Sequence, residues 1–291
     1  MGKTREIKKR IKAVGNIRRI TKTMQMIATS KFARAQQRAT ATKPYTVGVF
    51  ELVRELAATG GNLEHPLLNV REGAKPHELT LIITSDRGLA GPYNGSILRT
   101  AMAHLKGTPG TRDGVIELVG KKGVSFLKFN GVPVATQHTT GDKPTFEAIE
   151  RLAHGFMDRF ISGEVTAVRV IYMRYFSAGR QKPEVMQLLP LKPPPVKDQP
   201  AAKKQAVLYE FTPPAEELLG DLIPAAVKAT LFQAFNDAIV SEHVARMVAM
   251  KSATDNAGKM GKRLTRAYNR ARQAQITTEL TEIISGAAAL E

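Results

Sequence analysis

The turn at residues 84–92 carries residue types that could hold a phosphate group. Three nearby glycines follow a short apolar run, and Asp86 with Arg87 could supply a carboxylate and an anion-binding guanidinium. Free N–H groups at a helix start can bind phosphate. The glycine spacing, however, matches neither GxGxxG nor the P-loop pattern GxxxxGK followed by Ser or Thr. The turn therefore indicates a structural loop tied down by Asp86 and Arg87 more strongly than a nucleotide site.

Other catalytic and metal-binding patterns are missing from the sequence. The six His residues are scattered without an HExxH motif, and no Ser, His and Asp stand in the order of an elbow-type hydrolase. The absence of Cys excludes disulfides, Cys metal sites and thiol catalysis. We therefore expect no catalytic group, cofactor or metal in this chain. An enzyme of the doubly wound class is the weakest alternative.

Alternating strand-like and helix-like stretches fill the middle of the chain. Strands are expected near residues 79–84, 115–120, 132–136 and 165–175. Helices are expected near residues 96–106, from residue 122 onward, and at 144–161. This alternation predicts a doubly wound, mostly parallel α/β domain, which we place at residues 75–212. A late strand pair is expected at 185–189 and 207–211, with an irregular Pro-rich loop at 190–204.

Two much longer helical segments flank this domain, at residues 1–58 and 213–291. A helix of about 70 residues would be ~105 Å long at 1.5 Å per residue, so it must project beyond the core of a compact domain. Pro224 is expected to kink the start of the second helix. Gly258 and Gly261 each lower helix propensity by ~1 kcal/mol, which softens its middle.

Each long segment carries a narrow apolar stripe with steps of three and four residues. The first stripe consists of Ile7, Ile11, Val14, Ile17, Ile20, Met24 and Ile27. The second consists of Val227, Leu231, Phe235, Ile239, Val244, Met247, Met250, Ala253, Ala257, Met260 and Leu264. This spacing predicts that residues 1–58 pair with 214–286 in a coiled coil. If the pair is antiparallel and Ala57 faces Glu216 at the domain end, residue i lies roughly opposite residue 273 − i, and the helix from Gln273 onward extends unpaired.

The positive charge of the chain is concentrated at its N-terminus. The net charge is +17, and residues 1–38 hold twelve Lys or Arg and one acidic residue, Glu6. Nucleic-acid phosphates or an acidic protein surface could be the partner, and a merely solvated helix face is the third explanation. The apolar stripe shares its turns with the charges, and no aromatic residues interleave them, which weakens both DNA and RNA binding. A basic nucleic-acid-binding protein stays the alternative.

Segments spread over the whole chain resemble the gamma subunit of bacterial ATP synthases. They are IRRITKTMQMIA at 17–28, TSDRGLAG at 84–91, GKKG at 120–123, SEHVARMVAMKSATDNA at 241–257 and YNRARQAQITTELTEIISGA at 268–287. Gly261 departs from the family, which usually has a bulkier residue there, and the loop at 190–204 is particular to this chain. The Cys-bearing regulatory insert of chloroplast members is absent, so no thiol control is expected.

The resemblance implies a rotating central stalk. The two terminal helices would lie inside a hexamer of alternating alpha and beta subunits, with the α/β domain against the epsilon subunit and the c ring. Proton flow would turn ring and stalk together, and the stalk would drive each beta subunit through its nucleotide states. The chain would then be a non-catalytic part of an enzyme, peripheral to the membrane at the cytoplasmic face of the bacterial inner membrane, with no nucleic acid as partner.

The resemblance also implies which residues touch the hexamer. They are Lys22, Met24, Arg246, Arg272, Gln273, Thr277 and Glu279. The first three are expected to form one neighbourhood, because the 273 − i rule places Met24 near Ala249, within a turn of Arg246. The other four lie at the start of the expected overhang, where they would set the angular preference of the stalk.

We predict that the isolated chain neither hydrolyses ATP nor binds nucleotide tightly, because its sequence lacks a P-loop pattern. A coupled phosphate-release assay on the purified, hexamer-free chain should give the rate of a protein-free blank. Turnover that persists through further purification would contradict this prediction.

Overall fold

The computed structural model describes residues 2–59, 65–70, 76–108, 110–111, 114–192 and 215–288. The elements in chain order are α1 (Gly2–Thr59), β1 (Glu78–Ile83), α2 (Tyr93–Gly107), β2 (Val115–Val119), α3 (Lys121–Phe129), β3 (Thr136–His138), α4 (Phe146–Ile161), β4 (Ala167–Ser177), β5 (Arg180–Leu189) and α5 (Ala215–Ala288). The strand expected at 207–211 and most of the Pro-rich loop lie outside the described residues.

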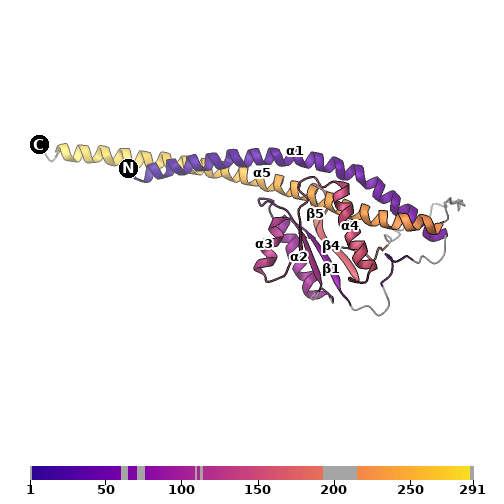
Figure 1. The fold of residues 1–291 in the computed structure, drawn as a ribbon. Coiled ribbons are helices and arrows are strands. Elements are labelled where there is room, and N and C mark those ends of the chain that lie inside the picture. The colour runs from indigo at the N-terminus through magenta and orange to yellow at the C-terminus, as the bar shows by residue number, and fades with distance from the viewer. Residues whose placement is uncertain are drawn as a thin grey trace. The chain divides into compact units, whose positions relative to one another are not determined.

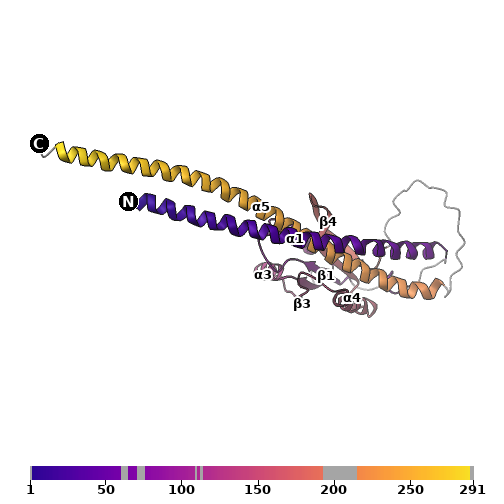
Figure 2. The ribbon, with the colours of Figure 1, turned by 90° about the horizontal axis from the view of Figure 1, so that it is seen from above.

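The chain divides into two compact units, and both long helices contribute to each of them. The helix-pair unit consists of Met1–Ser30 and Arg246–Glu291, and the sheet unit consists of Lys31–Ala245. In the helix-pair unit, α1 and α5 run in opposite directions (Figures 1 and 2). Both helices continue through an internal proline, Pro44 in α1 and Pro224 in α5.

The sheet unit confirms the predicted doubly wound domain. Its five strands follow the order β3-β2-β1-β4-β5, and all neighbours pair in parallel except β4 and β5. The central strand β1 is buried along its full length. The strand expected at 132–136 begins only at Thr136, because Pro133 has no N–H to donate to a ladder.

Helices cover both faces of this sheet. On one face, α2 and α3 bury Ile97, Ala101 and Leu127 against the strands. On the other, α4 packs with the first part of α5, and Phe156 and Phe235 are among its fully buried side chains. Figure 1 shows α2 and α3 on one side of the strands and α4 on the other. The sheet unit thus uses α5 as one of its own core helices.

The role of α5 as a core helix explains its apolar composition. An 18-residue stretch within Glu217–Ala287 reaches a mean hydropathy of 1.3, which is apolar enough to cross a membrane, and 44% of it is buried inside the protein. Core helices of proteins that never enter a membrane have the same composition. The stretch is therefore accounted for by the packing of α5 on the sheet.

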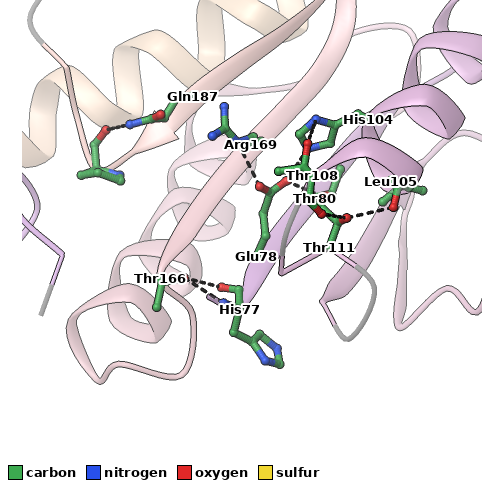
Figure 3. A network of polar contacts seen from close by, with 11 residues as sticks. His77, Glu78, Thr80, His104, Leu105, Thr108, Thr111, Thr166, Arg169 and Gln187 are labelled. Atoms are coloured by element: carbon green, nitrogen blue, oxygen red, sulfur yellow. Dashed lines mark hydrogen bonds and ion pairs between the residues drawn. The ribbon is translucent and has the colours of Figure 1, made fainter. Parts of the chain in front are cut away.

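Two buried glutamates form polar contacts between the strands of the sheet and the helices packed on it. Glu78 of β1 accepts a hydrogen bond from Arg169 Nε at 2.9 Å, and its Oε1 lies 2.5 Å from His104 Nε2 (Figure 3). A buried carboxylate is tolerated only where charged or polar partners replace its hydration shell. These contacts therefore fix α2 and β4 against β1 at the start of the strand.

The second glutamate repeats this arrangement on the other face. Glu117 of β2 accepts a hydrogen bond from Arg159 Nη1 of α4 at 2.8 Å, and its Oε2 lies 2.6 Å from His138 Nε2 of β3. Each face of the sheet is thus tied by one glutamate, one arginine and one histidine. None of these six residues was singled out by the sequence patterns.

The helix-pair unit confirms the predicted antiparallel pairing but corrects its apolar stripe. Val14, Thr21 and Ala28 are buried at steps of seven residues, whereas Ile17, Ile20 and Ile27 are 52%, 58% and 52% exposed. A coiled-coil seam repeats every 3.5 residues on average, whatever residue types occupy it. The predicted stripe includes residues outside the interface because it was chosen from large apolar residues alone, whereas small and hydroxyl residues fill much of the actual interface.

The same correction applies to α5. Met250 and Ala257 are buried as predicted, but Met260 is 54% exposed. The seam passes instead through Gly261, where an added Cβ would lie 4.0 Å from Val14 Cγ1. An added Cβ at Gly258 would lie 3.6 Å from Arg18 Nε. Both distances are ordinary van der Waals contacts, so neither glycine is required by close packing.

A pair of threonines sets the register between the two helices. Thr254 Oγ1 lies 2.8 Å from Thr21 Oγ1, and each hydroxyl also contacts a carbonyl of its own helix, that of Met250 or of Arg18. Their residue numbers add to 275, two more than the predicted 273. The approximate rule is thus shifted by two residues, because it was anchored on the expected segment ends instead of on a contact.

We predict that Gly258→Ala and Gly261→Ala each stabilise the helix-pair unit by about 1 kcal/mol, since alanine gains helix propensity and its Cβ meets no clash. Urea unfolding of the full chain and amide hydrogen exchange at residues 254–265 measure the effect. Gly123→Ala is the matched control. Its Cβ would lie 2.8 Å from Thr84 Oγ1, so it should destabilise. Loss of stability in both coiled-coil variants would contradict the prediction.

We also predict that Thr21→Val and Thr254→Val each cost about 1 kcal/mol, because each leaves one hydroxyl in the partly buried helix interface without its cross-helix partner. The double variant should cost less than the sum of the two, since it removes both polar groups from the seam. Thermal unfolding of the four proteins in this cycle measures the coupling. Strict additivity would show that the two hydroxyls do not act as a pair.

Candidate interaction surface of the helix pair

The surface of the helix-pair unit combines positive charge with exposed apolar side chains. Ile17, Ile20 and Ile27 of α1 lie among the basic residues of the N-terminal segment and face outward, as does Val248 of α5, which is 54% exposed. Lone exposed apolar residues are normal, but a row of them along one helix marks an interaction surface. The sequence patterns missed these isoleucines as surface residues because their spacing was assigned to the seam.

The predicted contact residues near Met24 lie on this surface. Lys22 is exposed, and Met24 and Arg246 are partly buried. With the observed register of 275 − i, Met24 falls opposite Lys251 and Arg246 falls opposite Thr29. At 1.5 Å per residue, the three residues span about 10 Å along the axis. They share one stretch of the helix pair, although Arg246 lies more than one turn from Met24.

The C-terminal end of α5 extends beyond its pairing with α1. Thr4 Oγ1 donates to Gln275 Oε1 at 3.1 Å, so contacts with α1 continue three residues past Arg272, the last residue that was predicted to have a partner. All described side chains from Ile276 to Ala287 are exposed. In Figure 1 the end of α5 runs past the start of α1.

This overhang differs in chemistry from the paired part below it. The sequence from Gln273 to Glu291 contains no Lys or Arg. Its large apolar side chains are exposed: Ile276 55%, Leu280 55%, Ile283 69% and Ile284 59%. The only charged residues of this segment are Glu279, Glu282 and Glu291, so it is an apolar helix that carries acidic side chains and no cations.

The predicted contact residues of the overhang face solvent in the chain alone. Arg272, Gln273, Thr277 and Glu279 are all exposed. The hydrogen bonds of the last three stay within the helix: Thr277 Oγ1 donates to the carbonyl of Gln273 at 3.1 Å, and Glu279 Oε1 accepts from Gln275 Nε2 at 2.8 Å. Their polar groups are therefore accessible to a surrounding partner.

The glycine-containing turn is a tied loop, as the sequence indicated. Asp86 Oδ1 accepts the backbone N–H of Lys121 at 3.1 Å, and Ser85 Oγ donates to the carbonyl of Arg87 at 2.7 Å. The acidic side chain thus joins the turn to the start of α3. Within the described part of the chain, no group of three or more His, Asp or Glu side chains could hold a metal ion.

Comparison with known proteins shows which family this sequence matches. A protein-family profile described as ATP synthase matches residues 3–290. The ATP synthase gamma chain of Rhodopirellula baltica is 40% identical over 296 residues, and that of Glaesserella parasuis serovar 5 is 38% identical over 296 residues. Both alignments cover 100% of this chain and 100% of the relative.

Solved structures share the fold. The rotor of the Euglena gracilis mitochondrial ATP synthase has a chain that matches with a TM-score of 0.65 at 19% identity, covering 94% of this chain and 99% of that one. A chain of the central stalk and c ring structure from Tetrahymena thermophila matches with a TM-score of 0.58 at 21% identity, covering 80% and 99%. From the full-length matches to the curated relatives, this chain belongs to the ATP synthase gamma chain family.

Proposed function

We propose that this chain is the rotating central stalk of a proton-translocating ATP synthase. It couples proton flow through the membrane sector to ATP synthesis or hydrolysis in a hexamer of alternating alpha and beta subunits. The observation that carries the proposal is the overhang of α5, which exposes apolar side chains and contains no Lys or Arg from Gln273 onward, whereas the paired part of the two helices is strongly basic. Membership of the gamma chain family supports it.

The helix pair suits this task because it presents a different face in each direction. The row of exposed isoleucines lies on α1, whereas α5 alone forms the overhang. A turning rod with such unequal faces brings a different set of side chains to each surrounding beta subunit in turn. The chain thereby transmits force between two sites of chemistry without a catalytic group of its own.

The sheet unit is proposed to contact the epsilon subunit and the c ring, at the cytoplasmic face of the bacterial inner membrane. The solved structures that share the fold support the contact with the c ring, since they are described as an ATP synthase rotor and as a central stalk with its c ring. A nucleic-acid-binding protein is disfavoured by the apolar side chains between the basic residues. Purification at moderate salt distinguishes the stalk function from nucleic-acid binding. A stalk should co-purify with alpha and beta subunits in a fixed ratio, whereas nucleic-acid binding weakens steeply with salt.

The overhang provides the first test of the proposal. Deletion of residues 286–291 should be tolerated, whereas deletion from Arg272 onward should strongly impair assembly or coupling, because it removes the whole unpaired helix and the contact at Gln275. Proton pumping and ATP synthesis by inverted membrane vesicles measure coupling, and subunit ratios measure assembly. Full activity after the longer deletion would contradict the proposal that the overhang contacts the surrounding alpha and beta subunits.

The surface near Met24 provides the second test. Met24→Lys should impair coupling more than assembly, because it adds a cation at a partly buried contact that moves against a beta subunit. Met24→Leu, which conserves volume and lacks charge, is the matched control and should behave as the parent. Unchanged ATP synthesis and proton pumping in Met24→Lys would exclude Met24 from the contact.

A further inference from the structure

We propose that the ion pair between Lys31 and Asp142 transmits torque between the sheet unit and α1. Lys31 Nζ lies 2.5 Å from Asp142 Oδ2. Lys31 is the first residue of the sheet unit on α1, and Asp142 lies in the turn between β3 and α4. The inference rests on the proposed stalk function and assigns a mechanical role to two residues outside the hexamer contacts.

At this end of the sheet unit, α5 is held by buried hydrogen bonds. Tyr93 OH donates to the carbonyl of Ala238 at 3.0 Å, and Ser241 Oγ donates to the carbonyl of Met173 at 3.2 Å. The first contact joins α5 to the start of α2 and the second joins it to β4, both away from solvent. Torque can therefore pass between the sheet and α5 through rigid, buried packing.

The contacts that attach α1 to the rest of the sheet unit differ from those of α5. Ala35 and Ala39 pack on Ile239 and Val240 of α5, and Phe32 packs edge-on against Tyr175 of β4 with ring centroids 6.4 Å apart. Gln36 Nε2 contacts Tyr175 OH of β4 at 3.5 Å, which is long for a hydrogen bond and involves neutral groups. The charge-assisted contact of Lys31 with Asp142 is much shorter, and such contacts are about twice as strong as neutral ones.

Several segments converge on the same carboxylate. The hydrogen bond from Lys31 lowers the pKa of Asp142, and the charges of Lys31, His243 and Arg87 lower it further, against the opposing effect of burial. Asp142 is thus ionised at neutral pH, so its contact with Lys31 is a charge-assisted one.

The pair is better suited to a mechanical role than to a stabilising one. The side chains of Lys31 and Asp142 are 37% and 40% exposed. An ion pair so accessible to water contributes ~0–1 kcal/mol to stability. Its removal should therefore leave the fold intact, while α1 loses its charged link to the sheet at the residue where it leaves this unit.

The test uses the assembled ATP synthase in inverted membrane vesicles, with Asp142→Asn or Lys31→Met in this chain. Both variants should assemble in normal subunit ratios but pump fewer protons per ATP hydrolysed, by about twofold or more, in line with the modest strength of the pair. Asp142→Glu and Lys31→Arg preserve the charges and should restore the ratio. Glu184→Gln, which breaks the comparably exposed Arg174–Glu184 pair, is the matched control and should leave the ratio unchanged.

Hydrogen exchange on the purified full chain gives a second measurement that does not depend on coupling. Asp142→Asn should speed exchange of the α1 amides at residues 31–40, and Glu184→Gln should not. The inference would be overturned if proton pumping or hydrogen exchange were unchanged in both Asp142→Asn and Lys31→Met. An equal loss of pumping in Glu184→Gln would overturn it as well. Either outcome would leave the proposed function standing. Failure of the unmodified chain to assemble with alpha and beta subunits would instead overturn the proposed function.

Discussion

The structure depends on one constraint, which is that two helices too long for a compact core must bury their seams against each other. In the helix-pair unit the seam is built from small and hydroxyl side chains such as Thr21, Ala28, Thr254 and Ala257. Small side chains let the helix backbones approach closely, and the threonine pair fixes which turns meet. Because α5 extends further than α1, this register also determines how much of α5 is left unpaired.

The same long helices serve two kinds of packing. Within the sheet unit, the first part of α5 is a core helix that contributes Ile223, Leu231 and Phe235 to the packing of the sheet. Within the helix-pair unit its seam narrows, and most of its surface faces outward. One continuous helix thus takes part in both units, as a core helix of the sheet unit and as one half of the helix pair.

Charged and exposed apolar side chains are arranged differently in the sheet unit and in the helix-pair unit. The buried glutamates of the sheet unit, Glu78 and Glu117, are each neutralised by an arginine and contacted by a histidine. The helix-pair unit instead keeps its cations exposed, with apolar side chains among them, and the overhang has no cations. Internal charges therefore rigidify the sheet, while external ones remain available to a partner.

The sequence by itself determined the elements and the class of fold. The period of the apolar residues separated the long helices from the central strands, and the segments at both ends carried the resemblance to the gamma chain family. These features are local, since the spacing of apolar residues over a few neighbouring positions is enough to indicate a strand or a helix. The strand expected at 132–136 was displaced only where Pro133 interrupts the run.

Tertiary structure alone decided which side of each helix is the interface and which residues meet across it. Ile17, Ile20 and Ile27 matched the seam in type but lie outside it, because the geometry of the pair, and not side-chain polarity, sets the 3.5-residue repeat. The glutamate–arginine–histidine contacts and the pair of Lys31 with Asp142 join residues 21 to 111 positions apart. Such contacts leave no periodic trace in a single sequence, because they depend on how distant elements are placed in space.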